Sequence, residues 1–219
     1  MFVGHVALAL AAKRRAPQVS LAWLVAAVLF LDILWPLFVL LDQENFVIMP
    51  DGTGFERFAF TWYPFSHSLV WSLVWAALAV GLVLILKGGR ATALLIGALV
   101  FSHWVLDWVT HAPDLPLTSG LGSPRYGLHL WGSTLWTFVI EGGMYAAGIW
   151  IYLTTTKAKD RIGTFALWGL LAVFTFLWAS VPFAPPPPSE GMIAWTGAIG
   201  MPLFVAWAGW ADRHRVRVE

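Results

Sequence analysis

The sequence predicts an all-α membrane protein, a polytopic helical bundle that forms one domain over residues 1–219. Two observations carry this prediction. Hydrophobic residues make up 59% of the 219 residues and charged residues only 11%, whereas about a quarter of a globular domain is charged. Apolar residues also form runs long enough to cross a bilayer, because about 20 residues at 1.5 Å per residue cover the hydrocarbon core.

Six apolar runs predict about six transmembrane helices. Pro36 has no N–H for the carbonyl of Asp32, four residues earlier, so we expect the first helix to be loosened there. A proline run at 185–188 forms a stiff turn that cannot continue the fifth helix. The predicted spans are about 20–41, 66–86, 92–111, 134–154, 164–181 and 192–211.

The segment 2–12 is also apolar but is too short to span a membrane before the basic cluster at residues 13–15. We expect a short re-entrant or interfacial helix. A signal peptide is the competing interpretation, but its basic cluster would precede the apolar stretch, whereas here it follows, and no small-residue cleavage site is evident.

Basic residues predict the orientation of the bundle. In the six-helix topology only Arg57 and Arg125 fall on one side, and the positive-inside rule makes the other side cytoplasmic. Both termini are then cytoplasmic, and the loops 42–65 and 112–133 face outward. The basic residues of the cytoplasmic side are Lys13, Arg14, Arg15, Lys87, Arg90, Lys157, Lys159, Arg161, Arg213, Arg215 and Arg217.

Ionisable residues recur inside the apolar runs. His103, Asp107 and His111 lie at i, i+4 and i+8, so on one helix they form a single stripe, about 17 to 29 Å from its cytoplasmic end. Counted in the same way, Asp32 and Glu141 also fall at or beyond the membrane midplane. His67 falls at the outer end of its helix, and His5 joins this layer if its segment is re-entrant.

Imidazole and carboxylate groups suit Zn²⁺ and related divalent ions, and a metal offsets the cost of burying an unpaired carboxylate in the membrane. The sequence has no cysteine, which excludes thiolate ligands and cysteine nucleophiles. We therefore favour a metal site over a purely structural hydrogen-bond network. A net charge of +1, with basic residues in short clusters, gives no reason to expect contact with nucleic acid.

An ordered series of His and Asp residues lies within about the first 130 residues: His5, Asp32, His67, His103, Asp107 and His111. This order in a small polytopic chain resembles the YdjM-like, or LexA-binding, family of bacterial inner-membrane metal-dependent hydrolases. That family is in turn similar to the zinc-dependent phospholipase C and P1-type nuclease group. The resemblance implies that these six residues, with His129 as a further position, bind one to three zinc ions in an inner-membrane protein.

The resemblance implies a phosphoric ester hydrolase that uses a metal-activated water, with Asp32 or Glu141 positioning that water. Because the cluster opens toward the outer leaflet, we expect a lipid headgroup or lipid-linked phosphodiester as substrate, and Arg125 could clamp its phosphate. A small transporter or ion carrier is the alternative, since it would also place His and Asp in the membrane. A haem protein with axial histidines is a third interpretation.

Overall fold

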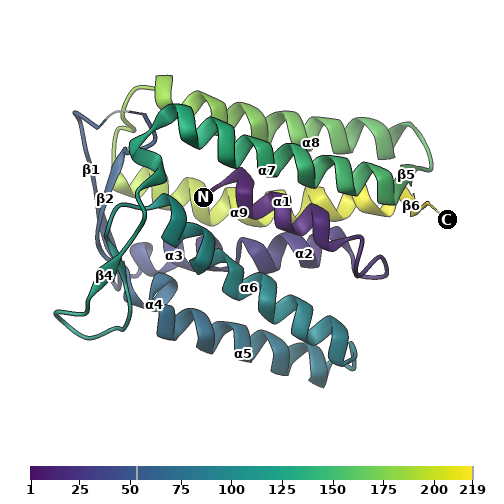
Figure 1. Cartoon of the computed structure of the whole chain (residues 1–219), viewed down its shortest axis with the longest axis horizontal. Helices are drawn as coiled ribbons and strands as arrows, with labels where there is room; N and C mark the ends of the chain where they lie inside the picture. The colour runs from purple at the N-terminus through teal and green to yellow at the C-terminus, as the bar shows by residue number, and fades with distance from the viewer. Residues whose placement is uncertain (53, 219) are drawn as a thin grey trace.

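The computed structural model describes residues 1–52 and 54–218 and is predominantly helical (Figure 1). Long helices lie roughly along one axis, and short strands pair at the two ends of the bundle. The elements are α1 (Val3–Ala12), α2 (Leu21–Val28), α3 (Phe30–Leu40), β1 (Asn45–Ile48), β2 (Phe58–Trp62), α4 (Pro64–His67), α5 (Leu69–Ile85), α6 (Arg90–Thr110), β3 (Leu115–Pro116), β4 (Arg125–Tyr126), η1 (Leu130–Gly132), α7 (Thr134–Thr155), β5 (Thr156–Ala158), α8 (Arg161–Ser180), η2 (Val181–Phe183), α9 (Glu190–Arg213) and β6 (Arg215–Arg217).

Helix α1 lies inside the bundle, and the N-terminus is near the middle of the molecule (Figure 1). Eight of its ten residues are buried. At its closest approach to α7, a Cβ added to Gly148 would lie 2.6 Å from the carbonyl oxygen of Ala7, so the two backbones touch there. The short first helix is therefore packed among the other helices of the bundle. Its re-entrant placement relative to a membrane stays a prediction.

The prediction of six spans is not supported. In the described residues, three helical segments are long and apolar enough to cross a membrane: Arg90–Thr110, Arg161–Phe183 and Glu190–Arg213. Helices α2 and α3 would make a fourth only if the pair, bent by 57°, is one broken span. Helix α5 has 17 residues, about 26 Å at 1.5 Å per residue, and α7 is less apolar because it carries Glu141 among glycine, tyrosine and threonine residues.

The break in the first predicted span is not at the position expected from Pro36. Helix α3 continues through Pro36, and the break lies at Leu29, three residues before Asp32. The ring of Pro36 instead packs against α9, where a Cβ added to Gly197 would lie 3.2 Å from it. Because of the break, Asp32 lies on α3, whose axis is bent by 57° from the axis of α2.

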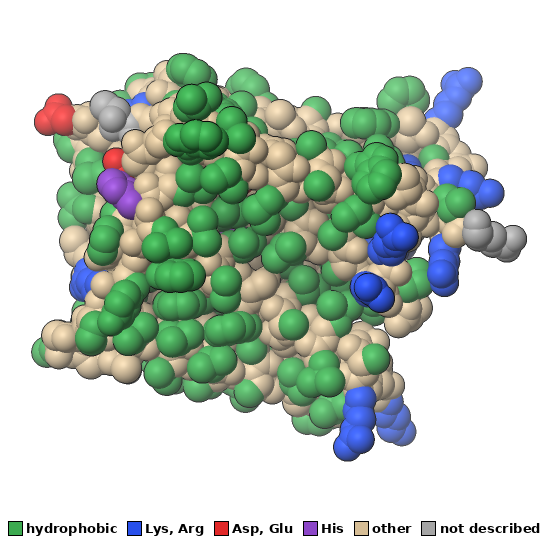
Figure 2. All heavy atoms as spheres, in the orientation of Figure 1, with side chains coloured by type: hydrophobic (Ala, Val, Ile, Leu, Met, Phe, Trp, Pro, Cys, Tyr) green, Lys and Arg blue, Asp and Glu red, His purple; other side chains and the backbone are tan. Residues whose placement is uncertain are grey.

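The two ends of the bundle differ in structure and charge. One end carries the antiparallel pairs β1–β2 and β3–β4, and the other carries β5–β6. On the face shown in Figure 2, most of the Lys and Arg side chains gather at the β5–β6 end. There Lys13 Nζ donates to Asp212 Oδ2 at 2.6 Å, and the hydroxyl of Tyr152 donates to Asp212 Oδ1 at 2.8 Å, which joins α1, α7 and α9.

Candidate metal centre

Five predicted ligands meet at one point in the bundle, contributed by four helices. His5 comes from α1, Asp32 from α3, His67 from α4, and His103 with Asp107 from α6. They form two groups in which the ligand atoms lie within 4.8 Å of one another: His5, His103 and Asp107, and Asp32, His67 and His103. Asp32 is the most exposed, with 24% of its side chain accessible, and the other four are buried. This buried cluster could hold a metal ion.

Helix α6 aligns His103 and Asp107 because residues four apart lie on one face. His103 Nε2 is 3.0 Å from Asp107 Oδ2. The predicted third member of the stripe, His111, does not follow them. Helix α6 ends at Thr110, and His111 has extended backbone (φ −66°, ψ 151°), so the i+8 alignment is lost.

The orientation of His103 is set by the break between α2 and α3. Val28 is the last residue of α2, where helix carbonyls have no helical donor. Its carbonyl accepts a hydrogen bond of 2.6 Å from Nδ1 of His103. A neutral imidazole carries one N–H, so this bond leaves a lone pair on Nε2. Nε2 is buried, and although Asp107 Oδ2 lies 3.0 Å away, the two atoms are not aligned as a hydrogen bond, so Nε2 has no hydrogen-bond partner among the described residues.

A chain of hydrogen-bonded polar groups holds Nδ1 of His67, as the carbonyl of Val28 holds Nδ1 of His103. Ser66 Oγ donates to Glu44 Oε2 at 2.6 Å, so it can only accept from His67 Nδ1, 2.7 Å away. Glu44 Oε1 also accepts from the backbone N–H groups of Phe65 and Ser66, both at 2.7 Å. Burial raises the pKa of Glu44, and these hydrogen bonds oppose that shift. His67 therefore also directs a lone pair of Nε2 into the cluster.

Lone pairs of nitrogen and oxygen face one another at the centre of the cluster. His67 Nε2 is 3.7 Å from Asp32 Oδ1 and 3.6 Å from Asp107 Oδ2, and His103 Nε2 is 3.6 Å from Asp32 Oδ1. A tetrahedral ion with bonds of about 2.0–2.1 Å holds its ligand atoms about 3.3–3.4 Å apart. The observed spacings are close to that. One divalent ion could satisfy both imidazoles, where a proton would satisfy one.

The geometry accommodates one three-ligand ion at a time. Both groups include His103, and only its Nε2 is free, so its lone pair can bind an ion in one group or the other. In the His5 group, Asp107 Oδ1 is already occupied by the N-terminal ammonium of Met1 and by His5 Nε2 at 3.0 Å. The group of Asp32, His67 and His103 does not include this carboxylate.

His111 belongs to a neighbouring polar group. Its Nδ1 lies 3.1 Å from Asp114 Oδ1, which also accepts a hydrogen bond of 2.7 Å from the hydroxyl of Tyr63. Burial and the nearby Asp114 raise the pKa of Tyr63. His111 is not in either ligand group.

The structure does not bring the remaining predicted site residues into either ligand group. His129 has positive φ (61°), is 48% exposed and pairs with Glu56. Glu141 is buried and accepts a hydrogen bond of 3.1 Å from the backbone N–H of Gly4, at the start of α1. Arg125 is exposed and donates to the backbone carbonyls of Phe60 and Thr61 in β2.

The sequence did not indicate two groups that hydrogen-bond to the histidines of the cluster, Ser66 and the carbonyl of Val28. It also did not indicate that α6 ends before His111. Ser66 lies next to His67 in sequence, which was a visible signal, but its partner Glu44 is 22 residues away. The carbonyl of Val28 has no sequence signature. Pro113 could have indicated that α6 ends before His111, because proline commonly follows a helix end within two residues.

Comparison with known proteins gives no relative: no family model, no curated protein and no solved structure matches this chain.

Proposed function

We propose that this protein is a membrane-embedded metal-dependent hydrolase, with one zinc ion bound by Asp32, His67 and His103. The observation that carries the proposal is the pair of buried imidazoles whose free Nε2 atoms face two carboxylates. Histidine with carboxylate is a ligand set typical of catalytic zinc. The resemblance to the YdjM-like hydrolases, based on the order of these residues, supports the same conclusion.

The roles of the residues follow from their exposure and contacts. A divalent ion bound there would lower the pKa of a coordinated water toward neutrality and stabilise a developing oxyanion. Asp32 stands at the most open edge of the cluster, so its second carboxylate oxygen can position the water and accept its proton. Val28 and Ser66 hold the two imidazoles in place, which is the role that outer-shell partners have in zinc sites.

We infer a lipid headgroup or a lipid-linked phosphodiester as the substrate. Helix α6, which could span a membrane, carries two residues of the cluster, and a lipid substrate could reach the cluster laterally. The basic end of the bundle is proposed to face the cytoplasm, following the positive-inside rule, with the inner membrane as the location. The cluster then lies toward the outer leaflet, because His103 is 13 residues, about 20 Å, beyond Arg90 along α6.

Metal analysis of the purified protein is the first test. We expect close to one equivalent of zinc, and loss of it in His103→Ala and His67→Ala. His129→Ala and His214→Gln are matched controls, since both remove a histidine outside the two groups. Equal zinc in all four variants would contradict the proposed ligand set. A Soret band in the absorption spectrum would instead assign the histidines to haem.

Hydrolysis is tested separately with the zinc-loaded protein in mixed micelles of phosphatidylglycerol and phosphatidylethanolamine. Phosphorus NMR should detect cleavage of headgroup esters by the wild type and by His129→Ala, and none by Asp32→Asn. Bound zinc without cleavage of either lipid would contradict this substrate class. Zinc-dependent ion flux in vesicles without cleavage would favour the transporter alternative.

A further inference from the structure

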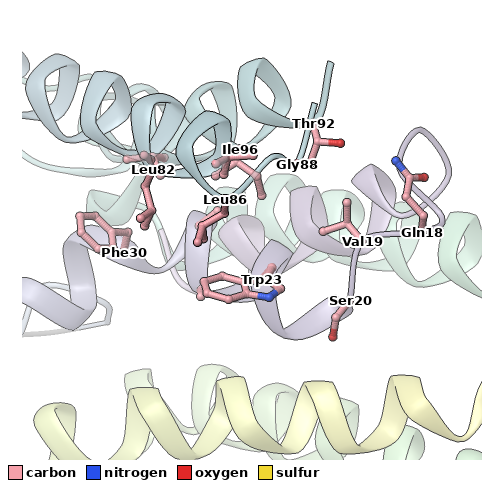
Figure 3. Close-up of a pocket in the computed structure, with 15 residues that line it drawn as sticks. Gln18, Val19, Ser20, Trp23, Phe30, Leu82, Leu86, Gly88, Thr92 and Ile96 are labelled. Atoms are coloured by element: carbon pink, nitrogen blue, oxygen red, sulfur yellow. The ribbon is translucent and has the colours of Figure 1, made fainter. Parts of the chain in front are cut away.

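A groove of about 530 Å³ runs along the side of the bundle, and its lining residues are not metal ligands, although Phe30 and Val100 at its inner end are close in sequence to Asp32 and His103. Its walls come from α2 with the segment before it, and from the facing helices α5 and α6 (Figure 3). A volume of this size falls within the range of about 300–1,000 Å³ typical of small-molecule sites.

The groove has an apolar inner part and a polar outer end. Phe30, Leu82 and Ile96 line the inner part, and the polar end has Gln18 and Thr92. Figure 3 shows Phe30 at one end of the groove and Gln18 and Thr92 at the other. An amphipathic ligand with one long apolar part and one polar head fits this distribution.

The length of the groove corresponds to one leaflet of a bilayer. From Thr92 to Val100, α6 covers eight residues, about 12 Å, and from Ser20 to Ala27 the opposite wall covers seven residues, about 10 Å, with Phe30 beyond the bend at Leu29. Half of a hydrocarbon core is about 15 Å. An acyl chain that enters from the polar end would therefore end near Phe30.

The polar end is positively charged. Lys87 lies between Leu86 and Gly88, which both line the groove, and Arg90 begins α6 just before Thr92. Both basic side chains are exposed, and neither forms a salt bridge within residues 1–52 and 54–218. An anionic phosphate at this end would give them a partner.

From these observations we propose that the groove binds an anionic phospholipid of the leaflet at the basic end. One acyl chain lies between α2 and the α5–α6 pair, and the phosphate contacts Lys87 and Arg90. This site is separate from the metal cluster, because its inner end stops at Phe30 and Val100, which are not metal ligands. The proposal does not depend on hydrolytic activity.

Native mass spectrometry tests the proposal by counting lipids retained on the purified full chain. Phosphatidylglycerol and phosphatidylcholine with identical acyl chains are compared. Each basic side chain near an anionic lipid is worth roughly fivefold in binding, so Lys87→Gln with Arg90→Gln should reduce retention of phosphatidylglycerol about twenty- to thirtyfold. Lys157→Gln with Arg161→Gln is the matched control, since both residues are exposed, lie at the same end and do not line the groove.

A second variant tests the apolar part of the groove. Ala79 lines the groove, and Ala79→Phe should reduce retention of both lipids because its ring would fill the space for the acyl chain. Zinc content and a monodisperse gel-filtration profile check that each variant is folded. Equal retention of the two lipids by the wild type, an equal loss in the control pair, or a protein dimer in place of lipid adducts would each overturn the proposal.

Discussion

Ser66→Ala tests whether the hydrogen-bond chain behind His67 prepares the cluster for metal. The substitution removes the acceptor of the His67 Nδ1–H, 2.7 Å away, and the donor to Glu44 Oε2. Without that acceptor, the ring proton can move to Nε2, where Asp32 and Asp107 lie within 3.7 Å. A metal ion must then displace this proton before His67 can bind it.

The expected loss is tenfold to a hundredfold in metal affinity, as is typical for outer-shell partners of zinc ligands. That range corresponds to about 1.4–2.7 kcal/mol. An independent estimate gives a similar figure, since a buried donor left without an acceptor costs about 1–3 kcal/mol. Both groups are buried, so water cannot readily replace the lost hydroxyl.

The assay is competition with a zinc chelator of known affinity, using the detergent-purified protein at neutral pH. Ser72→Ala is the matched control, because Ser72 is also buried and its hydroxyl donates only to the carbonyl of Ser68. The reasoning would be refuted if Ser66→Ala bound zinc within twofold of the wild type, or if Ser72→Ala lost as much.

Three further predictions concern acid, helix packing and a buried ion pair. Histidine must be neutral to bind a metal, so acid should release zinc, which dialysis at stepwise lower pH and elemental analysis would measure; release on raising the pH to 8 would contradict this. Gly148→Ala should lower the free energy of unfolding by about 1–3 kcal/mol, because its Cβ would lie 2.6 Å from the carbonyl oxygen of Ala7. Thermal unfolding measures this loss. Gly143→Ala on the same helix is the control, because its Cβ would meet nothing within 4 Å and should leave the stability unchanged. Lys13→Met should cost about 3–5 kcal/mol by leaving Asp212 without its cation, whereas Arg14→Met, at an exposed position, should change the denaturant midpoint little.

Part of the cluster could be predicted from the sequence, namely the residues whose position depends on spacing along one helix or on the distance from the end of a helix. His103 and Asp107 are one helical turn apart on α6, and this spacing alone placed them on one face. Counting helix rise placed Asp32 in the same layer as His103, and His5 joined this layer on the condition that its segment re-enters. Such rules use only local geometry, and the structure brings these residues together.

The sequence could not predict features that depend on where helices stop or on distant partners. His111 leaves the stripe because α6 ends one residue earlier. Glu141 has the hydropathy signature of a functional carboxylate, yet its contact is the backbone of Gly4, 137 residues away. Six spans are not supported because apolar runs in the sequence do not reveal the bend at Leu29, the short length of α5 or the polar residues that lower the hydropathy of α7.

The docking of α1 also constrains the order in which the protein can assemble during synthesis. Helix α1 is fixed by contacts with segments that are synthesised much later: Gly4 with Glu141, and Lys13 with Asp212, 199 residues further on. Until α7 has emerged, α1 lacks its largest contact surface, and until α9 has emerged Lys13 lacks its carboxylate. Stable docking of α1 is therefore a late event, so a ribosome stalled before α7 should leave a nascent chain whose helix α1 is accessible to protease.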